Sequence, residues 1–74
     1  MDWEKIVGVN LRRLRKERGL SQEGLAGEAG LAMRHLGRIE RGEGNPTVAI
    51  LGRLADVLGV QPTAFYEYEA APKG

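Results

Sequence analysis

The side chains best suited to chemistry in this sequence are arginines, which occur in two groups. Residues 10–18 read NLRRLRKER, and Arg34, Arg38 and Arg41 form a second group. A guanidinium can donate two parallel hydrogen bonds to a guanine edge or bind a phosphate, so basic groups of this kind are typical of nucleic-acid binding. The alternative is that these charges are only the solvated face of a helix, and charge alone favours that alternative.

Catalytic and metal chemistry find little support in the same residues. His35 is the only histidine and the chain has no cysteine, so a convincing metal site cannot be assembled. His35, Ser21 and a carboxylate do not have the spacing of a hydrolase triad. The sequence therefore predicts no enzyme, no metal and no cofactor.

Length and composition limit the architecture. The 74 residues, of which 42% are hydrophobic and 28% charged, predict one small domain over residues 1–74. We find no apolar run that could cross a membrane, no signal peptide at the N-terminus and no sensor region for a small-molecule effector. We therefore expect a cytoplasmic protein without a membrane partner.

Capping residues and glycines divide the chain into five expected helices, with no strand-like alternation. The helices are expected at about 2–18, 21–29, 32–40, 47–58 and 62–68. Asp2, Ser21 and Thr47 are suited to N-caps, and Pro62 to the first position of the last helix. The expected core is formed by Leu11, Leu14, Leu25, Leu36, Ile39, Leu51, Leu54, Leu58 and Phe65, and Trp3 and Val7 share the apolar face of the first helix.

The second and third expected helices form a helix-turn-helix pattern. Gly30 and Leu31 supply the turn, and Ala26 is small where the two helices cross. Leu36 and Ile39 anchor the third helix on the core. The residues that must then face outward are Met33, Arg34, Gly37, Arg38 and Arg41.

Residues 14–46, LRKERGLSQEGLAGEAGLAMRHLGRIERGEGNP, closely resemble the Cro/repressor-type helix-turn-helix family, also called the XRE family. The most diagnostic pieces are GLSQEGLA, AGL and RIERG in that order, and the similarity continues through LGRLADVLGVQPTAFY. In size and layout the chain is most similar to restriction-modification controller proteins. The resemblance implies an all-α, lambda repressor-like domain of five helices. It also implies transcriptional regulation by a homodimer on a palindromic site in double-stranded DNA.

The resemblance also implies roles for particular residues. Met33, Arg34 and Arg38 match positions that reach base edges or nearby phosphates, and Gln22, Asn45 and Thr47 match phosphate contacts. Ser21, His35 and Arg12 are further candidates for the DNA backbone. Arg15 and Glu40 match a partly buried ion pair. Met33 either packs on a thymine methyl group or folds back over Leu36.

Three departures from the family pattern concern the third helix and the loop after it. Ala32 stands where a capping Ser, Thr or Asp is usual, which typically costs ~1 kcal/mol. Gly37 replaces a commonly polar residue at a similar cost of ~1 kcal/mol relative to Ala. Glu43 and Gly44 stand where Lys or Arg is common.

The end of the chain bears on partners. Ala64, Phe65, Tyr66 and Tyr68 give the last helix more apolar surface than a small monomer needs, which predicts a dimer interface. Alternatively, Phe65 belongs to the core and the tyrosines cover it. A second functional hypothesis is an antitoxin that binds a toxin and its own promoter. Only EYEAAPKG follows the last helix, which favours the regulator.

Overall fold

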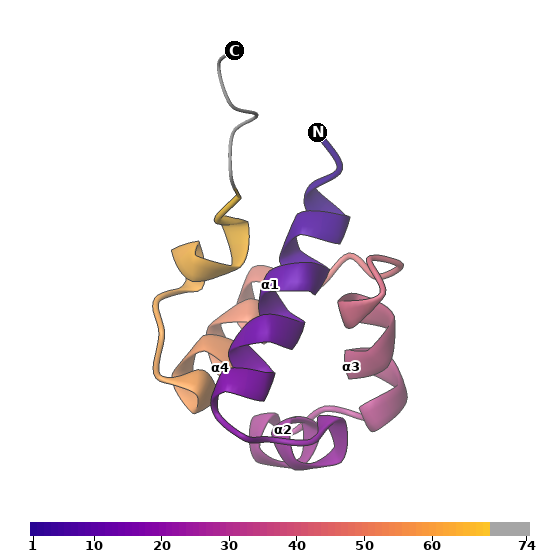
Figure 1. Ribbon diagram of the computed structural model, residues 1–74. Helices are drawn as coiled ribbons and strands as arrows, with labels where there is room; N and C mark the ends of the chain where they lie inside the picture. Colours follow the sequence, from indigo (N-terminus) through magenta and orange to yellow (C-terminus); the bar gives the residue numbers. More distant parts are fainter. Residues whose placement is uncertain (69–74) are drawn as a thin grey trace.

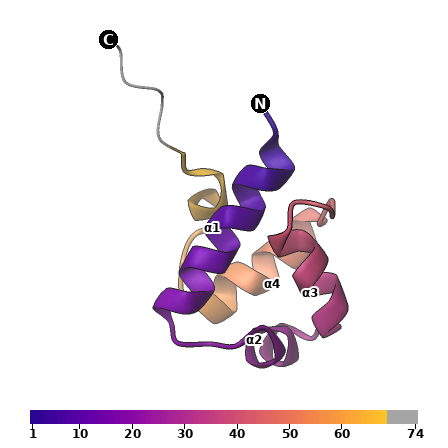
Figure 2. The same cartoon turned by 45° about the vertical axis from the view of Figure 1, so that its right-hand side comes forward.

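The computed structural model describes residues 1–68, and its regular structure is four α-helices followed by one 3₁₀ segment. The elements are α1 (Trp3–Glu17), α2 (Gln22–Ala29), α3 (Met33–Glu40), α4 (Val48–Leu58) and η1 (Pro62–Tyr66). No strand occurs among these residues, which confirms the all-α class. α2 lies across the lower end of α1, and α4 runs behind α1 in both views (Figure 1, Figure 2).

Each of the first four helices begins one residue later than expected, because the expected first residue is its N-cap. The side chains of Asp2, Ser21 and Thr47 accept hydrogen bonds from backbone N–H groups three residues on, at 3.1, 2.9 and 3.1 Å. These bonds satisfy donors that a helix leaves unpaired. Ala32 occupies the same place before α3 and makes no side-chain capping bond.

The core lies between all five elements, α1, α2, α3, α4 and η1. All nine residues expected in it are buried, and Val7, Ala26, Ala29 and Ala55 are buried with them. Seven large side chains are less than 2% exposed: Phe65, Leu11, Leu25, Leu36, Ile39, Leu54 and Leu58. Burial of a large apolar side chain is worth roughly 1.5–3 kcal/mol, so these residues dominate the folding energy.

The expectation of a fifth α-helix over 62–68 is wrong. The segment is a 3₁₀ helix that ends at Tyr66, and Glu67 is extended (φ −70°, ψ 136°). The cause is a tertiary contact, because the Asn10 amide donates to the carbonyl oxygens of Phe65 (2.8 Å) and Glu67 (2.7 Å). Those bonds hold the chain end on α1 in a shape that an α-helix would not allow. Residues 69–74, most of the segment weighed for the antitoxin hypothesis, lie outside the described residues.

Trp3 also departs from expectation. It shares the apolar spacing of Val7, Leu11 and Leu14, yet it is 45% exposed. The first turn of α1 extends beyond the other helices (Figure 1). There Trp3 meets the edges of Tyr66 and Tyr68, with ring centroids 6.0 and 5.6 Å apart. The indole therefore belongs to a surface aromatic group, and Val7 is the first residue of α1 in the core.

Candidate nucleic-acid interface

The central element of the candidate site is α3, which is fixed to the domain by one face only. Gly30 ends α2 in the left-handed conformation (φ 72°, ψ 34°), and the Leu31 N–H donates to the Ala26 carbonyl at 2.8 Å. Ala26 is buried at this turn, and α3 buries Leu36 and Ile39. The turn and these anchors set the orientation of α3, and its opposite face lies at the surface.

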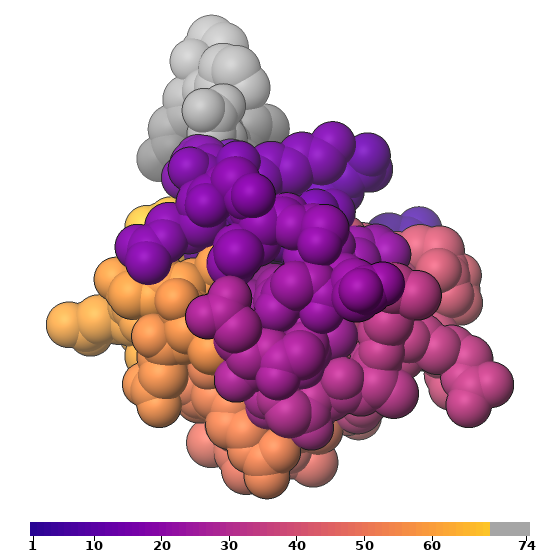
Figure 3. All heavy atoms as spheres, turned by 90° about the horizontal axis from the view of Figure 1, so that it is seen from below, coloured from indigo at the N-terminus to yellow at the C-terminus, as the bar shows by residue number. Residues whose placement is uncertain are grey.

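The outer face of α3 carries cationic and thioether side chains. Arg34, Arg38 and Arg41 are exposed, and Met33 is 50% exposed. Within residues 1–68, no carboxylate forms an ion pair with Arg34 or Arg38. Their guanidinium donors can therefore meet an incoming ligand without first breaking an ion pair. Seen from below, α2 occupies the middle of the surface, with α3 on one side and α4 on the other (Figure 3).

A buried ion pair supports this face from behind. The Arg15 Nε and Nη2 atoms donate to the two Glu40 carboxylate oxygens at 2.6 and 3.0 Å. Both side chains are largely buried, 10% and 3% exposed, and Arg15 also donates to the Leu20 carbonyl at 2.9 Å. Two parallel hydrogen bonds make a strong and geometrically strict contact. The pair therefore links α1 to the last turn of α3.

Gln22 is joined to the same ion pair. Its Nε2 atom donates to Glu40 Oε1 at 3.0 Å. This bond connects the first turn of α2 with the last turn of α3. An amide nitrogen has two protons, so one donor remains for a ligand. Glu40 thus holds both the arginine behind the site and the glutamine at its surface.

The other candidate phosphate contacts lie on α1, on α3 and at the N-terminal ends of α2 and α4. Ser21 and Thr47 are exposed N-caps of α2 and α4, and their hydroxyl oxygens already accept backbone bonds, which leaves each hydroxyl proton to donate. Asn45 is exposed in the loop before α4, and His35 is half-buried on α3. Arg12 is exposed on α1, and among residues 1–68 it has no hydrogen bond to the other candidates.

Gly37 does not face solvent as the sequence suggests. It is buried, because the side chains of Arg41 and Gln22 lie over it. A Cβ atom built on Gly37 would be 3.3 Å from Arg41 Nη1 and 3.9 Å from Gln22 Oε1. Arg41 in turn forms an exposed ion pair with Glu43. Helical spacing predicted Arg41 on the outer face, but neither Arg41 nor Glu43 was assigned a role in binding. The signal for the pair was an acidic residue two positions after an outward arginine.

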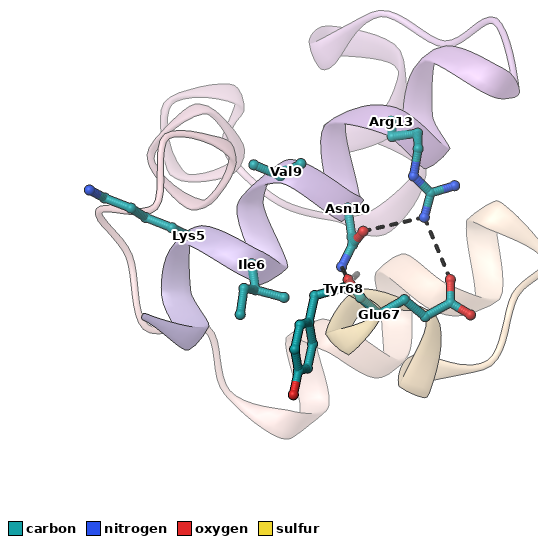
Figure 4. A pocket seen from close by; sticks show the side chains of 7 residues that line it. All are labelled: Lys5, Ile6, Val9, Asn10, Arg13, Glu67 and Tyr68. Carbon is teal, nitrogen blue, oxygen red and sulfur yellow. Dashed lines mark hydrogen bonds and ion pairs between the residues drawn. The ribbon is translucent and has the colours of Figure 1, made fainter. Parts of the chain in front are cut away.

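A second polar arrangement joins α1 to the end of the chain. Asn10, which is buried, binds the Phe65 and Glu67 carbonyls, and its Oδ1 accepts from Arg13 at 3.3 Å. Arg13 also pairs with Glu17 and Glu67 at 3.2 and 3.6 Å. Figure 4 shows Asn10, Arg13 and Glu67 beside Tyr68 in an open groove of about 620 Å³. The sequence signal for Asn10 was its place on the helix face that also carries Val7 and Leu14.

The residues expected at a dimer interface divide into two kinds. Tyr66 and Tyr68 are exposed, 43% and 54%, and Ala64 is half-buried against the core. Phe65 is completely buried inside its own domain, so it cannot reach a partner, and its expected place in an interface is wrong. Exposed and buried side chains lie next to each other in this segment because 3₁₀ geometry turns neighbouring side chains to different sides.

The described residues offer neither a metal site nor a membrane-spanning helix. Within residues 1–68, no group of three or more histidine, cysteine or acidic residues is arranged to hold a metal ion. None of the helices in that range combines the length and hydropathy needed to span a membrane.

Comparison with known proteins identifies the architecture. Residues 11–65 match the model of the helix-turn-helix family HTH_3. The chain is 48% identical over 60 residues to the HTH-type transcriptional regulator y4dJ of Sinorhizobium fredii, covering 81% of this chain and 78% of that protein.

Two solved structures share the fold closely. The restriction-modification controller protein C.AhdI of Aeromonas hydrophila superimposes with a TM-score of 0.82 at 36% identity, covering 85% of this chain and 96% of that one. The N-terminal DNA-binding domain of SinR from Bacillus subtilis gives 0.82 at 31% identity, covering 90% and 99%.

Proposed function

The chain belongs to the XRE-type helix-turn-helix family of DNA-binding transcriptional regulators, which are not enzymes, and we propose that it acts as a homodimer on a palindromic operator. The observation that carries the proposal is the outer face of α3, where Arg34 and Arg38 are exposed and unpaired among residues 1–68. An α-helix fits the major groove of B-DNA, and guanidinium groups on its outer face can reach base edges and phosphates.

Base readout is assigned to the first turn of α3. Arg34 can donate two hydrogen bonds to guanine O6 and N7, which is worth ~1–3 kcal/mol of discrimination. Met33, half exposed beside it, offers an apolar contact for a thymine methyl group. Arg38 lies one turn further along the helix, where either a base edge or a phosphate is within reach.

Backbone contacts are assigned to the residues around α3. Gln22, with one amide proton left after its bond to Glu40, and Ser21 lie at the N-terminal end of α2, where backbone dipoles attract an anion. Asn45 and Thr47 offer the same chemistry at the start of α4. We assign His35 and Arg12 to outer contacts with the DNA phosphates. Contacts of this kind fix the register of the protein on DNA and carry no sequence information.

The dimer is assigned to the exposed aromatic group of Trp3, Tyr66 and Tyr68. Large exposed aromatic side chains in contact with one another are typical of interfaces, since they bury much area at a low entropic cost. The Asn10 bonds fix the segment that carries both tyrosines, so this surface is preorganised. Ala64 lies at its inner edge. Operator binding would take place in the cytoplasm, with residues 1–74 acting as one DNA-binding unit.

The proposal is tested by selecting duplexes with a random central segment for binding to the purified chain. The enriched sequence should be a palindrome whose half-site centres are one turn of B-DNA apart, about 34 Å. Its affinity should exceed that for a scrambled duplex by at least about a thousandfold. Enrichment of no sequence, or equal affinities for the enriched and scrambled duplexes, would contradict the proposal.

A further inference from the structure

Arg41 has an unusual course over the outer face of α3. It is the C-cap residue of the helix, yet its guanidinium lies above Gly37, one turn back toward the N-terminus. Long side chains on a helix generally point toward its N-terminus. Because Gly37 has no side chain, there is space above it. Arg41 Nη1 and the Gln22 amide both lie beside this space. A cation and an amide therefore share the middle of the outer face.

Glu43 pairs with the Nε–Nη2 edge of the same guanidinium. Arg41 Nε and Nη2 lie 3.0 and 3.4 Å from the two Glu43 carboxylate oxygens, while both side chains stay more than half exposed, at 58% and 55%. The hydrogen bond from Arg41 and its charge lower the pKa of Glu43 below its ordinary value, and Arg38 lowers it slightly further. Pairing with Arg41 therefore favours the ionised form of the Glu43 carboxylate.

A carboxylate and a phosphate use the same edge of a guanidinium, each accepting two parallel hydrogen bonds. An exposed ion pair contributes only about 0–1 kcal/mol, because water screens it and two long side chains must be ordered. Such a pair is weak enough to be exchanged for a phosphate. Two groups cannot occupy the Nε–Nη2 edge together, so one must leave when the other binds.

We propose that Glu43 is an internal competitor of DNA phosphate for Arg41. In the free protein the carboxylate occupies the Nε–Nη2 edge of the guanidinium, and on DNA a phosphate replaces it at that edge. The inference rests on the proposed function, since it needs α3 to lie against DNA. Because a phosphate is present at every base pair, the exchange lowers affinity for all sequences alike. Glu43 therefore sets the overall strength of binding and leaves the choice of sequence to the first turn of α3.

The test is a double-mutant cycle of Glu43→Gln and Arg41→Ala, with affinities measured on the enriched and scrambled duplexes. Glu43→Gln alone should raise affinity on both duplexes by up to about fivefold per chain bound, the equivalent of an exposed ion pair. In the Arg41→Ala background the same change should have no effect. Glu17→Gln is the matched control, because Glu17 is also exposed and paired with an arginine, but on α1; it should leave affinity unchanged.

Three results would overturn the inference. An equal gain from Glu43→Gln with and without Arg41 would mean that the carboxylate acts through its long-range field and not through the pair. No gain in the wild-type background would mean that Arg41 does not exchange its partner. Binding of neither duplex by any variant, although the helical circular dichroism is retained, would refute the proposed function itself and the exchange with it.

Discussion

At the scale of single residues, the arginines of α3 differ in what they can distinguish. Arg34 lies in the first turn of the helix and Arg38 one turn later, and both are exposed. A base edge differs from one base pair to the next, whereas a phosphate does not. An arginine that reads a base and an arginine that holds a phosphate therefore fail in different ways when they are removed.

Arg34→Ala should weaken binding to the enriched operator by about 1–3 kcal/mol and affect scrambled DNA much less. Arg38→Ala should weaken both by a similar factor and reduce the slope of log affinity against log salt by about one unit per site occupied. Titrations of both variants on both duplexes at several salt concentrations measure this. Equal losses for Arg34→Ala on the two duplexes would make it a phosphate contact.

Glu40 is predicted to be structural. Glu40→Ala leaves Arg15 charged, largely buried and without its carboxylate, and should lower the free energy of unfolding by about 3–5 kcal/mol. Thermal melts check this, and Glu40→Gln, which keeps an acceptor for Arg15, should lose less. At temperatures where the variants remain folded, the ratio of operator to scrambled affinity should stay near that of the wild type. A wild-type melting temperature with a lost ratio would make Glu40 a specificity residue instead.

The outward arginines and the residues that anchor α3 on the core could be predicted from the sequence, because helical spacing fixes which side chains share a face. The same spacing put Gly37 on the outer face, because it does not reveal that the side chains of Arg41 and Gln22 lie over it. It also left out Asn10, whose role depends on carbonyl groups more than fifty residues later in the chain. Helical spacing in the sequence therefore predicts which residues share a face. Contacts between distant residues, such as those of Asn10, are seen only in the folded structure.

At the scale of elements, the same distinction explains which boundaries could be predicted. Asp2, Ser21 and Thr47 cap the helices that they were expected to begin, since a cap acts within four residues. The last element could not be predicted, because its hydrogen bonds from Asn10 outweigh the helical preference of five residues. Short helices depend on tertiary packing for most of their stability.

The missing cap of α3 gives a prediction at this scale. Ala32 has the extended backbone of an N-cap (φ −69°, ψ 138°) but no side-chain acceptor. Ala32→Ser should therefore stabilise the domain by ~1 kcal/mol. For a domain of this size that equals a rise in melting temperature of about 4–8 °C. Ser21→Ala, the reverse change at a working cap, is the control and should lower the melting temperature. An unchanged melting temperature for Ala32→Ser would mean that the first backbone N–H groups of α3 already have other hydrogen-bond partners.

At the scale of the whole molecule, the proposed operator binding needs two chains. One α3 covers only a few base pairs, whereas a palindrome offers two equivalent half-sites to a symmetric dimer. Trp3, Tyr66 and Tyr68 form an exposed aromatic group, and the net charge of +1 does little to keep copies of the chain apart.

Tyr66→Glu should shift the sedimentation of the free protein from dimer to monomer, because it puts a charge into the proposed apolar interface. Met33→Glu changes an equally exposed apolar side chain on α3 and should leave the dimer intact. A wild-type chain that sediments as a monomer at high micromolar concentration would contradict the prediction. So would a dimer that both variants preserve.

The most direct test of the central claim is the dependence of affinity on the distance between half-sites. A dimer with two α3 helices in successive major grooves requires half-site centres about 34 Å apart on one side of the duplex. Inserting about 5 base pairs, half a helical turn, moves one half-site to the opposite side. Affinity should then fall at least about tenfold, to that of a duplex with a single half-site. Affinity unchanged by the insertion would show that the two chains do not bind the operator as one symmetric unit.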